Sequence, residues 1–209
     1  MTRPIESPFV SRAGLKLDHA LREFKIDVTG LTCADFGCNI GGFTDCLLQR
    51  SAAKVFAIDT GYGTLAWKLR NDPRVIVMER TNALHAKPHA AQSGGVDLVV
   101  IDLAWTPQRL AIPAALRWLK PGGSIITLVK PHYELDEDEK KSLLIDGRLD
   151  PSAAQIILLR VLAQMPSWGV RPVAHTISPI TGGKSSKNKP GTGNVEYLVL
   201  AQPIDQSCP

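Results

Sequence analysis

The sequence has few cysteines and no long apolar run, and each absence excludes a class of protein. Its 209 residues include four cysteines without a C-x-x-C pair, and three of them, Cys33, Cys38 and Cys46, lie in apolar segments. Such thiols usually pack as small hydrophobic groups, so we expect neither a metal centre nor a disulfide framework. The two most apolar stretches, 96–105 and 153–165, are short and interrupted by charged residues. Neither is suited to cross a bilayer, so we expect no membrane partner.

The features of a secreted protein are also missing. The first eight residues have no apolar signal-peptide core, and the chain has no N-x-S/T glycosylation site. We therefore expect a cytoplasmic protein. Its length and its hydrophobic content of 44% favour one domain over two. We place that domain at 1–209, with an extended lead over 1–10 and a tail over 202–209.

What the sequence does contain is an alternation of strand-like and helical segments. Strand-like runs fall at 31–36, 54–58, 74–78, 96–102 and 124–129, and helical patterns at 12–24, 43–50, 64–70, 106–119 and 151–165. Such alternation favours a parallel sheet covered on both faces. Two more strand-like runs, 170–177 and 194–201, have no helix between them and can pair antiparallel. The sequence therefore predicts an α/β, Rossmann-like fold with a doubly wound, mostly parallel seven-stranded sheet and one antiparallel strand near its edge. Residues 134–149 are expected to form a mobile loop or lid.

The turn after the first strand has the composition of a ligand-binding loop. It runs Asp35-Phe36-Gly37-Cys38-Asn39-Ile40-Gly41-Gly42-Phe43-Thr44, with glycines that let backbone approach a ligand and a helix N-terminus that presents free N–H groups. A dinucleotide fingerprint would have glycine at position 39. Asn39 and the negative charge of Asp35 disfavour a pyrophosphate and suit the cationic sulfonium of S-adenosylmethionine. The pattern favours that cofactor, with an ordinary glycine-rich turn as the alternative.

Polar residues follow four of the predicted strands at their carboxyl ends, where ligands bind in open α/β sheets. Asp59 is placed to accept both ribose hydroxyls, with helix capping as its alternative role. Asn82 would read adenine edges or form a plain turn. Asp102 and Lys130 end the fourth and fifth strands with opposite charges. A lysine that closes an apolar strand is partly desolvated, which favours its neutral form, so Lys130 is the candidate base. A strand-end charge turned to water is the alternative for both residues.

These segments resemble the FtsJ-type ribose methyltransferases, and more closely the catalytic part of the TlyA proteins, which are also called haemolysins. The matching rows span nearly the whole chain: Val-Ser-Arg-Ala-Gly-Leu-Lys-Leu (10–17), Gly-Gly-Phe-Thr-Asp-Cys-Leu-Leu-Gln-Arg (41–50), Gly-Tyr-Gly (61–63), Leu-Ala-Trp-Lys-Leu-Arg (65–70), Leu-Val-Lys-Pro (128–131) and Gly-Asn-Val-Glu-Tyr (193–197). The resemblance implies S-adenosylmethionine as cofactor and the ribose 2′-hydroxyl of an RNA, by analogy ribosomal, as methyl acceptor.

The resemblance also implies a Lys-Asp-Lys-Glu tetrad, which Lys16, Asp102, Lys130 and Glu196 match. Lys130 would take the proton from the 2′-hydroxyl, while the other three hold it in place and tune its charge. The expected cofactor-binding residues lie in the glycine turn and at the strand ends; they are Asp35, Gly37, Cys38, Asn39, Gly41, Gly42, Phe43, Thr44, Asp59, Asn82 and Asp102.

Two features depart from the TlyA pattern. TlyA proteins usually begin with a small S4-type RNA-binding domain, but only ten residues precede Ser11 here. RNA capture is therefore expected from elsewhere in the chain or from a partner protein. The candidate RNA contacts are basic residues at Arg12, Lys184, Lys187 and Lys189, with Arg3 and Arg109 as further candidates. The row Asp-Leu-Ala-Trp at 102–105 also replaces the usual Asp-Val-Ser-Phe.

Three other functions compete with RNA methylation. One keeps the cofactor and uses a non-RNA acceptor. A haemolysin-type protein that acts on membranes is disfavoured, because the sequence shows no spanning segment and four matched polar residues would be a costly coincidence in a passive module. A nicotinamide oxidoreductase is disfavoured by Asn39 and Asp35.

Overall fold

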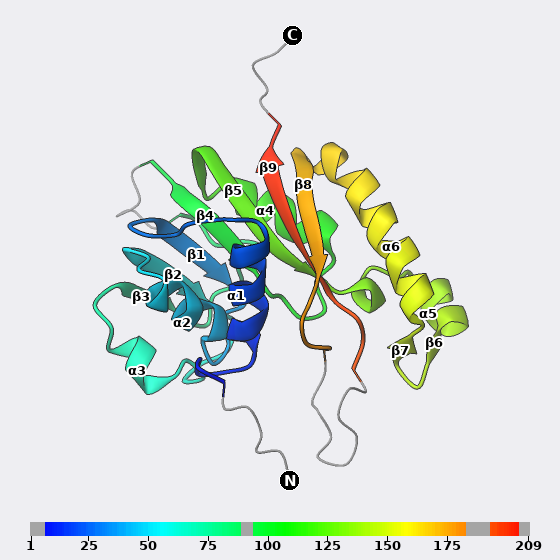
Figure 1. Ribbon diagram of the computed structural model, residues 1–209, viewed down its shortest axis with the longest axis horizontal. Helices are drawn as coiled ribbons and strands as arrows, with labels where there is room; N and C mark the ends of the chain where they lie inside the picture. Colours follow the sequence, from blue (N-terminus) through cyan, green and yellow to red (C-terminus); the bar gives the residue numbers. More distant parts are fainter. Residues whose placement is uncertain (1–6, 89–93, 183–192, 205–209) are drawn as a thin grey trace.

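One seven-stranded sheet runs through the computed structural model, which describes residues 7–88, 94–182 and 193–204 (Figure 1). The strand order is β3-β2-β1-β4-β5-β9-β8. β9 runs antiparallel to both of its neighbours, and the other pairs are parallel. The strands are β1 (Thr32–Phe36), β2 (Lys54–Ile58), β3 (Val75–Met78), β4 (Val96–Ile101), β5 (Leu119–Val129), β8 (Val170–Ile177) and β9 (Tyr197–Pro203). The predicted fold, with its single antiparallel strand next to an edge, is confirmed.

Helices cover both faces of this sheet, because alternate side chains of each central strand point to opposite sides. In β1, Ala34 and Phe36 pack into one apolar cluster and Cys33 into the other. The first cluster holds side chains of α4 (Gln108–Leu116) and α6 (Pro151–Gln164), and the second holds side chains of α1 (Ala13–Glu23) and α2 (Gly42–Gln49). A short helix, α3 (Trp67–Arg70), adds Leu69 to the second cluster.

The strand register brings the carboxyl ends of the parallel strands to one edge. Phe36 is level with Ile58 on one side and with Ile101 on the other. On the far side of β5, Val129 pairs with Tyr197, the first residue of β9. The residues after β1, β2, β4 and β5 and the residue before β9 therefore meet at this edge.

Several boundaries differ from the sequence prediction. β5 begins at Leu119 rather than at 124, because Pro121 and Gly122 are carried within the strand, where a register shift against β4 accommodates them. β9 runs to Pro203 and includes the start of the expected tail. The helix expected at 64–70 has only the four residues of α3.

The expected loop or lid at 134–149 is instead built from regular elements, so that prediction was wrong. It contains α5 (Glu137–Leu143) and a two-stranded hairpin of β6 (Leu144–Ile145) and β7 (Arg148–Leu149). A capping box between Asp136 and Glu139 starts α5, and Arg160 of α6 forms an ion pair with Glu139. The remaining elements among the described residues are two short 3₁₀ turns, η1 (Pro131–Tyr133) and η2 (Met165–Trp168). Within the described ranges, no helix has both the length and the apolarity that crossing a membrane requires.

Candidate active site

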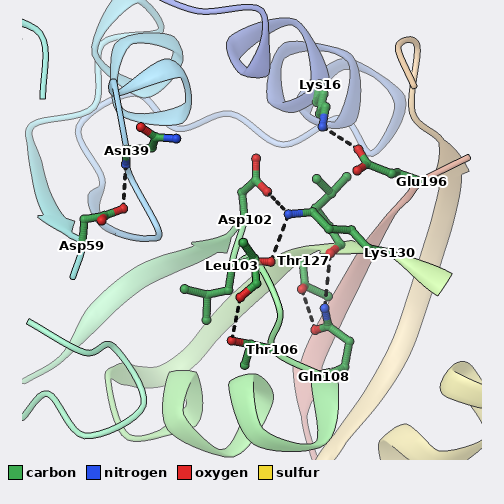
Figure 2. Close-up of polar contacts among 12 residues, drawn as sticks. Lys16, Asn39, Asp59, Asp102, Leu103, Thr106, Gln108, Thr127, Lys130 and Glu196 are labelled. Carbon is green, nitrogen blue, oxygen red and sulfur yellow. Dashed lines mark hydrogen bonds and ion pairs between the residues drawn. The ribbon is translucent and has the colours of Figure 1, made fainter. Parts of the chain in front are cut away.

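Four charged side chains from distant segments form two ion pairs at the carboxyl edge of the sheet (Figure 2). Lys130 Nζ lies 2.6 Å from Asp102 Oδ1, and Lys16 Nζ lies 2.5 Å from Glu196 Oε2. All four residues line one cavity of about 670 Å³. Lys16, Lys130 and Glu196 are buried, and Asp102 is half-buried. Because a buried ion pair costs desolvation and is weak evidence for stability, two such pairs around one cavity indicate a functional site.

Each of these side chains is positioned by the element that carries it. Lys16 lies on the buried side of α1, next to Leu17. Asp102 directly follows β4, and its backbone N–H donates to Phe36 O at 3.0 Å. Lys130 directly follows β5 and is followed by Pro131, which begins the 3₁₀ turn η1. Glu196 precedes β9, and its carbonyl accepts from the Ser178 N–H at 2.9 Å.

A second layer of hydrogen bonds holds the loop after β4 against the end of β5. Gln108, buried at the start of α4, donates from Nε2 to Leu128 O at 3.2 Å and accepts from Thr127 Oγ1 at 2.7 Å. The Glu134 carboxylate accepts from the Gln108 backbone N–H at 3.0 Å. Burial raises the pKa of Glu134 to about 7. Sequence reasoning missed these residues, because no local pattern distinguishes a buried glutamine from a surface one.

Two further cavities of about 410 Å³ each are both lined by Asp102 and share the turn after β1 as a wall. Seven of the expected cofactor residues line one or both of them: Gly37, Cys38, Asn39, Phe43, Asp59, Asn82 and Asp102. Ile40, Leu103 and Ala104 also line these cavities, and the sequence did not single them out. We call these two cavities the cleft; their walls combine apolar side chains with polar groups of the kind that orient a bound ligand.

Gly37 shows why the turn after β1 requires glycine. Its φ is +87°, and a Cβ there would lie 2.6 Å from the backbone oxygen of Asp102. A side chain would therefore push apart the ends of β1 and β4. Glycine is thus required at position 37 because of the backbone of Asp102, which follows the neighbouring strand β4.

Asp59 and Asn82 each accept backbone hydrogen bonds and also line a cavity, and their expected contacts with the cofactor stay predictions. The Asp59 carboxylate accepts from the backbone N–H groups of Asn39 at 2.9 Å and Gly61 at 2.7 Å, and it also lines one cavity. Asn82 accepts from the Leu84 N–H at 2.9 Å, a turn contact, and lines the same cavity. Turn formation and exposure to the cavity are thus compatible at both positions.

Four expected cofactor residues, Asp35, Gly41, Gly42 and Thr44, are buried and line none of these three cavities. Asp35 accepts from Thr44 Oγ1 at 2.7 Å, and its other oxygen has no partner within the described part of the chain. Burial raises the pKa of Asp35 to about 7. A Cβ on Gly42 would lie 2.3 Å from Ser11 Oγ, so this glycine lets α1 pack against α2. Asp35 is therefore only partly ionised near pH 7 and lines none of these cavities, and its expected contact with the cofactor stays a prediction.

The Cys38 thiol lines the cleft without being a reactive group. Burial, and then the nearby carboxylates of Asp35 and Asp59, raise its pKa, which keeps it protonated at neutral pH. A protonated thiol is a poor nucleophile.

Of the expected RNA contacts, Arg12 is exposed and lines one of the smaller cavities. Arg109 is exposed on α4. The other expected contacts, Arg3, Lys184, Lys187 and Lys189, lie outside the described residues.

Three aromatic rings line the large cavity, and one of them is Trp105, the last residue of the 102–105 row that departs from the TlyA pattern. Trp105 is 82% exposed with a φ of +59°, and its ring centroid lies 5.1 Å from that of Tyr133. Tyr133 in turn lies 4.1 Å from the ring of His132. Burial, and then the charge of Lys130, lower the pKa of His132 to about 4, so its ring is neutral at pH 7. An exposed, strained tryptophan beside charged groups is a typical stacking surface for a planar ligand.

Known proteins share both the sequence and the fold. The FtsJ-like methyltransferase family matches residues 9–187. TlyA of Mycobacterium tuberculosis, named a 16S/23S rRNA (cytidine-2′-O)-methyltransferase, is 41% identical over 93% of this chain and 68% of its own length. YqxC of Bacillus subtilis, provisionally named an rRNA methyltransferase, is 39% identical over 91% of this chain and 64% of its own. The chain thus spans about two thirds of these relatives.

Solved structures of related proteins have the same fold as this chain. A Streptococcus thermophilus protein, provisionally named a hemolysin, has 33% identity and a TM-score of 0.86, covering 97% of this chain and 70% of that one. Structures of proteins described as S-adenosylmethionine-dependent methyltransferases share the fold alone, at 16% identity. The cofactor predicted from the glycine turn is confirmed at the level of the family.

Proposed function

The chain belongs to the FtsJ-like methyltransferase family, and we propose that it transfers the methyl group of S-adenosylmethionine to a ribose 2′-hydroxyl of RNA. We propose ribosomal RNA as the substrate and a cytidine as the target, because its relative TlyA is named an enzyme of that kind. Since the chain spans 64% of YqxC and 68% of TlyA, both assignments are proposals for this protein.

One observation carries the proposal: Lys130 and Asp102 form an ion pair in the cavity that Lys16 and Glu196 also line. Asp102 also lines both smaller cavities. A methyl donor held there and an acceptor held in the large cavity would meet beside the Lys130–Asp102 pair. Such a juxtaposition is what an in-line transfer between two bound molecules requires.

Lys130 is suited to remove the acceptor's proton. Its Nζ donates to Asp102 Oδ1 at 2.6 Å and to Leu103 O at 3.0 Å. A neutral amine has two N–H groups and one lone pair, so these two bonds would leave the lone pair for the 2′-hydroxyl proton. The hydroxyl oxygen would then accept the methyl group in line as the carbon–sulfur bond breaks, and the proton would stay on Lys130 Nζ until solvent removes it.

The bound cofactor supplies an already activated methyl group, so the protein's work is alignment and proton removal. The residues of the cleft fit this cofactor. Asp59 offers carboxylate oxygens for ribose hydroxyls at a wall that also includes the apolar side chains of Ile58 and Leu103. Lys16 and Glu196 would hold the acceptor sugar from the side opposite Asp102.

The aromatic wall supports a nucleic-acid acceptor. Trp105 and Tyr133 expose rings beside the tetrad, and bases stack on such rings in single-stranded RNA recognition. A small aliphatic acceptor would have no use for this surface.

The test is incubation of the purified protein with methyl-labelled S-adenosylmethionine and unmodified ribosomal subunits, in parallel with free nucleosides. We expect label on a ribose 2′-oxygen of the RNA and none on nucleosides. Label on a base would contradict the roles proposed for the tetrad. Label on nucleosides alone would contradict RNA as the substrate.

A further inference from the structure

The large cavity extends well beyond the tetrad, and its outer wall is the β6–β7 hairpin. Leu144, Asp146, Gly147 and Arg148 of this hairpin line the cavity, together with Lys140 of α5. In Figure 1 the hairpin lies at the lower edge of the molecule, which is also where the chain approaches β9. At about 670 Å³, the cavity is large enough for more than a sugar ring. The chemistry proposed at Lys130 does not use the residues of this outer wall.

The shape of the hairpin is fixed by its own turn. Asp146 and Gly147 have φ values of +50° and +73°, and Asp-Gly is a preferred pair for a two-residue turn of this hand. The strands pair through Leu144 with Leu149 and Ile145 with Arg148. Arg148 therefore directly follows the turn on a defined strand.

Asn194 ties the hairpin to the tetrad. Its Oδ1 accepts from the Leu149 N–H at 2.8 Å, and its Nδ2 donates to Gly147 O at 3.0 Å. Asn194 lies two residues before Glu196, which pairs with Lys16. The distance between the hairpin and the tetrad is thus set by one side chain and a short piece of backbone.

The charges of the cavity distinguish Arg148 from its neighbours. Lys16, Lys130 and Lys140 are each paired with a carboxylate, of Glu196, Asp102 and Glu137 respectively. No ion pair joins Arg148 to any residue within 7–88, 94–182 and 193–204. A guanidinium is always charged and binds phosphate oxygens through two parallel N–H groups.

We propose that the β6–β7 hairpin is an RNA-backbone contact of this enzyme, in which Arg148 binds the phosphate next to the ribose that is methylated. This inference rests on the proposed function, since it names the part of the substrate that the outer cavity takes. Asn194 acts as a positioning residue that keeps this phosphate site at a fixed distance from the tetrad.

The test is the affinity of the Arg148→Gln variant for a short, fluorescein-labelled, cytidine-containing single-stranded RNA, measured by anisotropy across a salt series. Removing one phosphate contact should weaken binding about five- to tenfold and reduce the slope of log K against log salt by about 0.7. Affinity for S-adenosylmethionine, measured by calorimetry, should not change.

Arg171→Gln is the matched control, because it removes the same charge from an exposed arginine at the opposite end of the sheet, where the Arg171 guanidinium donates to Gln202 Oε1 at 2.6 Å. It should leave both the affinity and the salt slope unchanged. A second arm replaces the phosphate beside the target cytidine by a neutral methylphosphonate. That change should weaken RNA binding by the wild type and have no further effect on Arg148→Gln.

The outcomes separate this inference from the proposed function. If the wild type methylates RNA ribose while Arg148→Gln binds RNA with wild-type affinity and slope, the hairpin inference is overturned and the proposed function stands. A parallel loss of S-adenosylmethionine affinity would show that Arg148 acts through the fold, which also overturns the inference. A wild type that neither binds nor methylates RNA overturns both.

Discussion

Lys130 Nζ lies 2.6 Å from Oδ1 of Asp102, although the two residues follow different strands and stand 28 positions apart in the sequence. β4 and β5 are neighbours in the sheet, and each ends directly before its charged residue. The pair is therefore a product of parallel strand register. The same Nζ also donates to Leu103 O, so its orientation is fixed by two acceptors on one loop.

Replacing Lys130 by alanine should lower turnover with little effect on cofactor affinity. A general base contributes about 10²–10⁴-fold to the rate, so kcat of Lys130→Ala should fall by that order. The cofactor cleft keeps its other walls, so the Kd for S-adenosylmethionine should stay within about threefold. Methylation kinetics and calorimetry measure the two quantities.

Lys120→Ala serves as the control for that variant. Lys120 forms an ion pair with Asp97 at the opposite end of the same two strands. Because this pair is partly exposed and remote from the cavities, its loss should leave kcat unchanged. If Lys130→Ala loses cofactor affinity in parallel with turnover, Lys130 is a structural residue and the proposed base is another group.

Gly37→Ala should damage the site through the backbone. Its Cβ would lie 2.6 Å from Asp102 O, so the ends of β1 and β4 must separate and Asp102 must move away from Lys130. We expect both the affinity for S-adenosylmethionine and kcat to fall. Gly122→Ala is the control, since Gly122 also has a positive φ, +78°, and a Cβ there would meet nothing within 4 Å. Equal effects of the two changes would assign the loss to backbone strain alone.

The alternation of apolar runs and helical patterns predicted the sheet and its carboxyl edge. Because ligands bind at that edge in open α/β folds, the polar residues at strand ends were found from the sequence alone. Asp59, Asp102 and Lys130 all line cavities there. Lys16 and Glu196 were named only through the family resemblance, since neither a lysine on a helix nor a glutamate before a strand has a local signature.

What the sequence did not predict depends on contacts between distant segments. The sequence of β1 gives no sign that the Asp35 carboxyl accepts from Thr44 of α2 and is buried there. The lid expected at 134–149 forms a helix and a hairpin, fixed by Arg160 and Asn194. Those partners lie outside the segment, so a local composition full of charges suggested a loop.

Trp105→Ala should weaken RNA binding. The ring is 82% exposed and lies beside Tyr133, and base–aromatic stacking contributes about 1–3 kcal/mol per base by alanine substitution. The KM for RNA should therefore rise by about fivefold or more. Trp105→Phe keeps a stacking ring and should restore most of the affinity. If alanine and phenylalanine weaken binding equally, the indole N–H or the local backbone is the important feature.

Asp35 should make the protein less stable as the pH rises from about 4 to 7. Burial raises the pKa of its carboxyl from 3.8 to about 7, so over this range the folded state holds a proton that the unfolded state has released. The free energy of unfolding therefore falls with rising pH, and above pH 7 the fold carries a buried carboxylate with one oxygen that has no hydrogen-bond partner among the described residues.

The Asp35→Asn variant isolates this effect. Its amide oxygen can still accept from Thr44 Oγ1, and it has no charge to bury. The variant's stability relative to the wild type, measured by urea unfolding, should therefore be higher at pH 8 than at pH 5. Asp27→Asn is the control, because hydrogen bonds from Thr29 lower the pKa of Asp27, so its contribution is lost only as the solution becomes acidic, below this range. A pH-independent difference for Asp35→Asn would mean that Asp35 ionises as an exposed aspartate does, and that its environment is more polar than the packing of β1 against α2 implies.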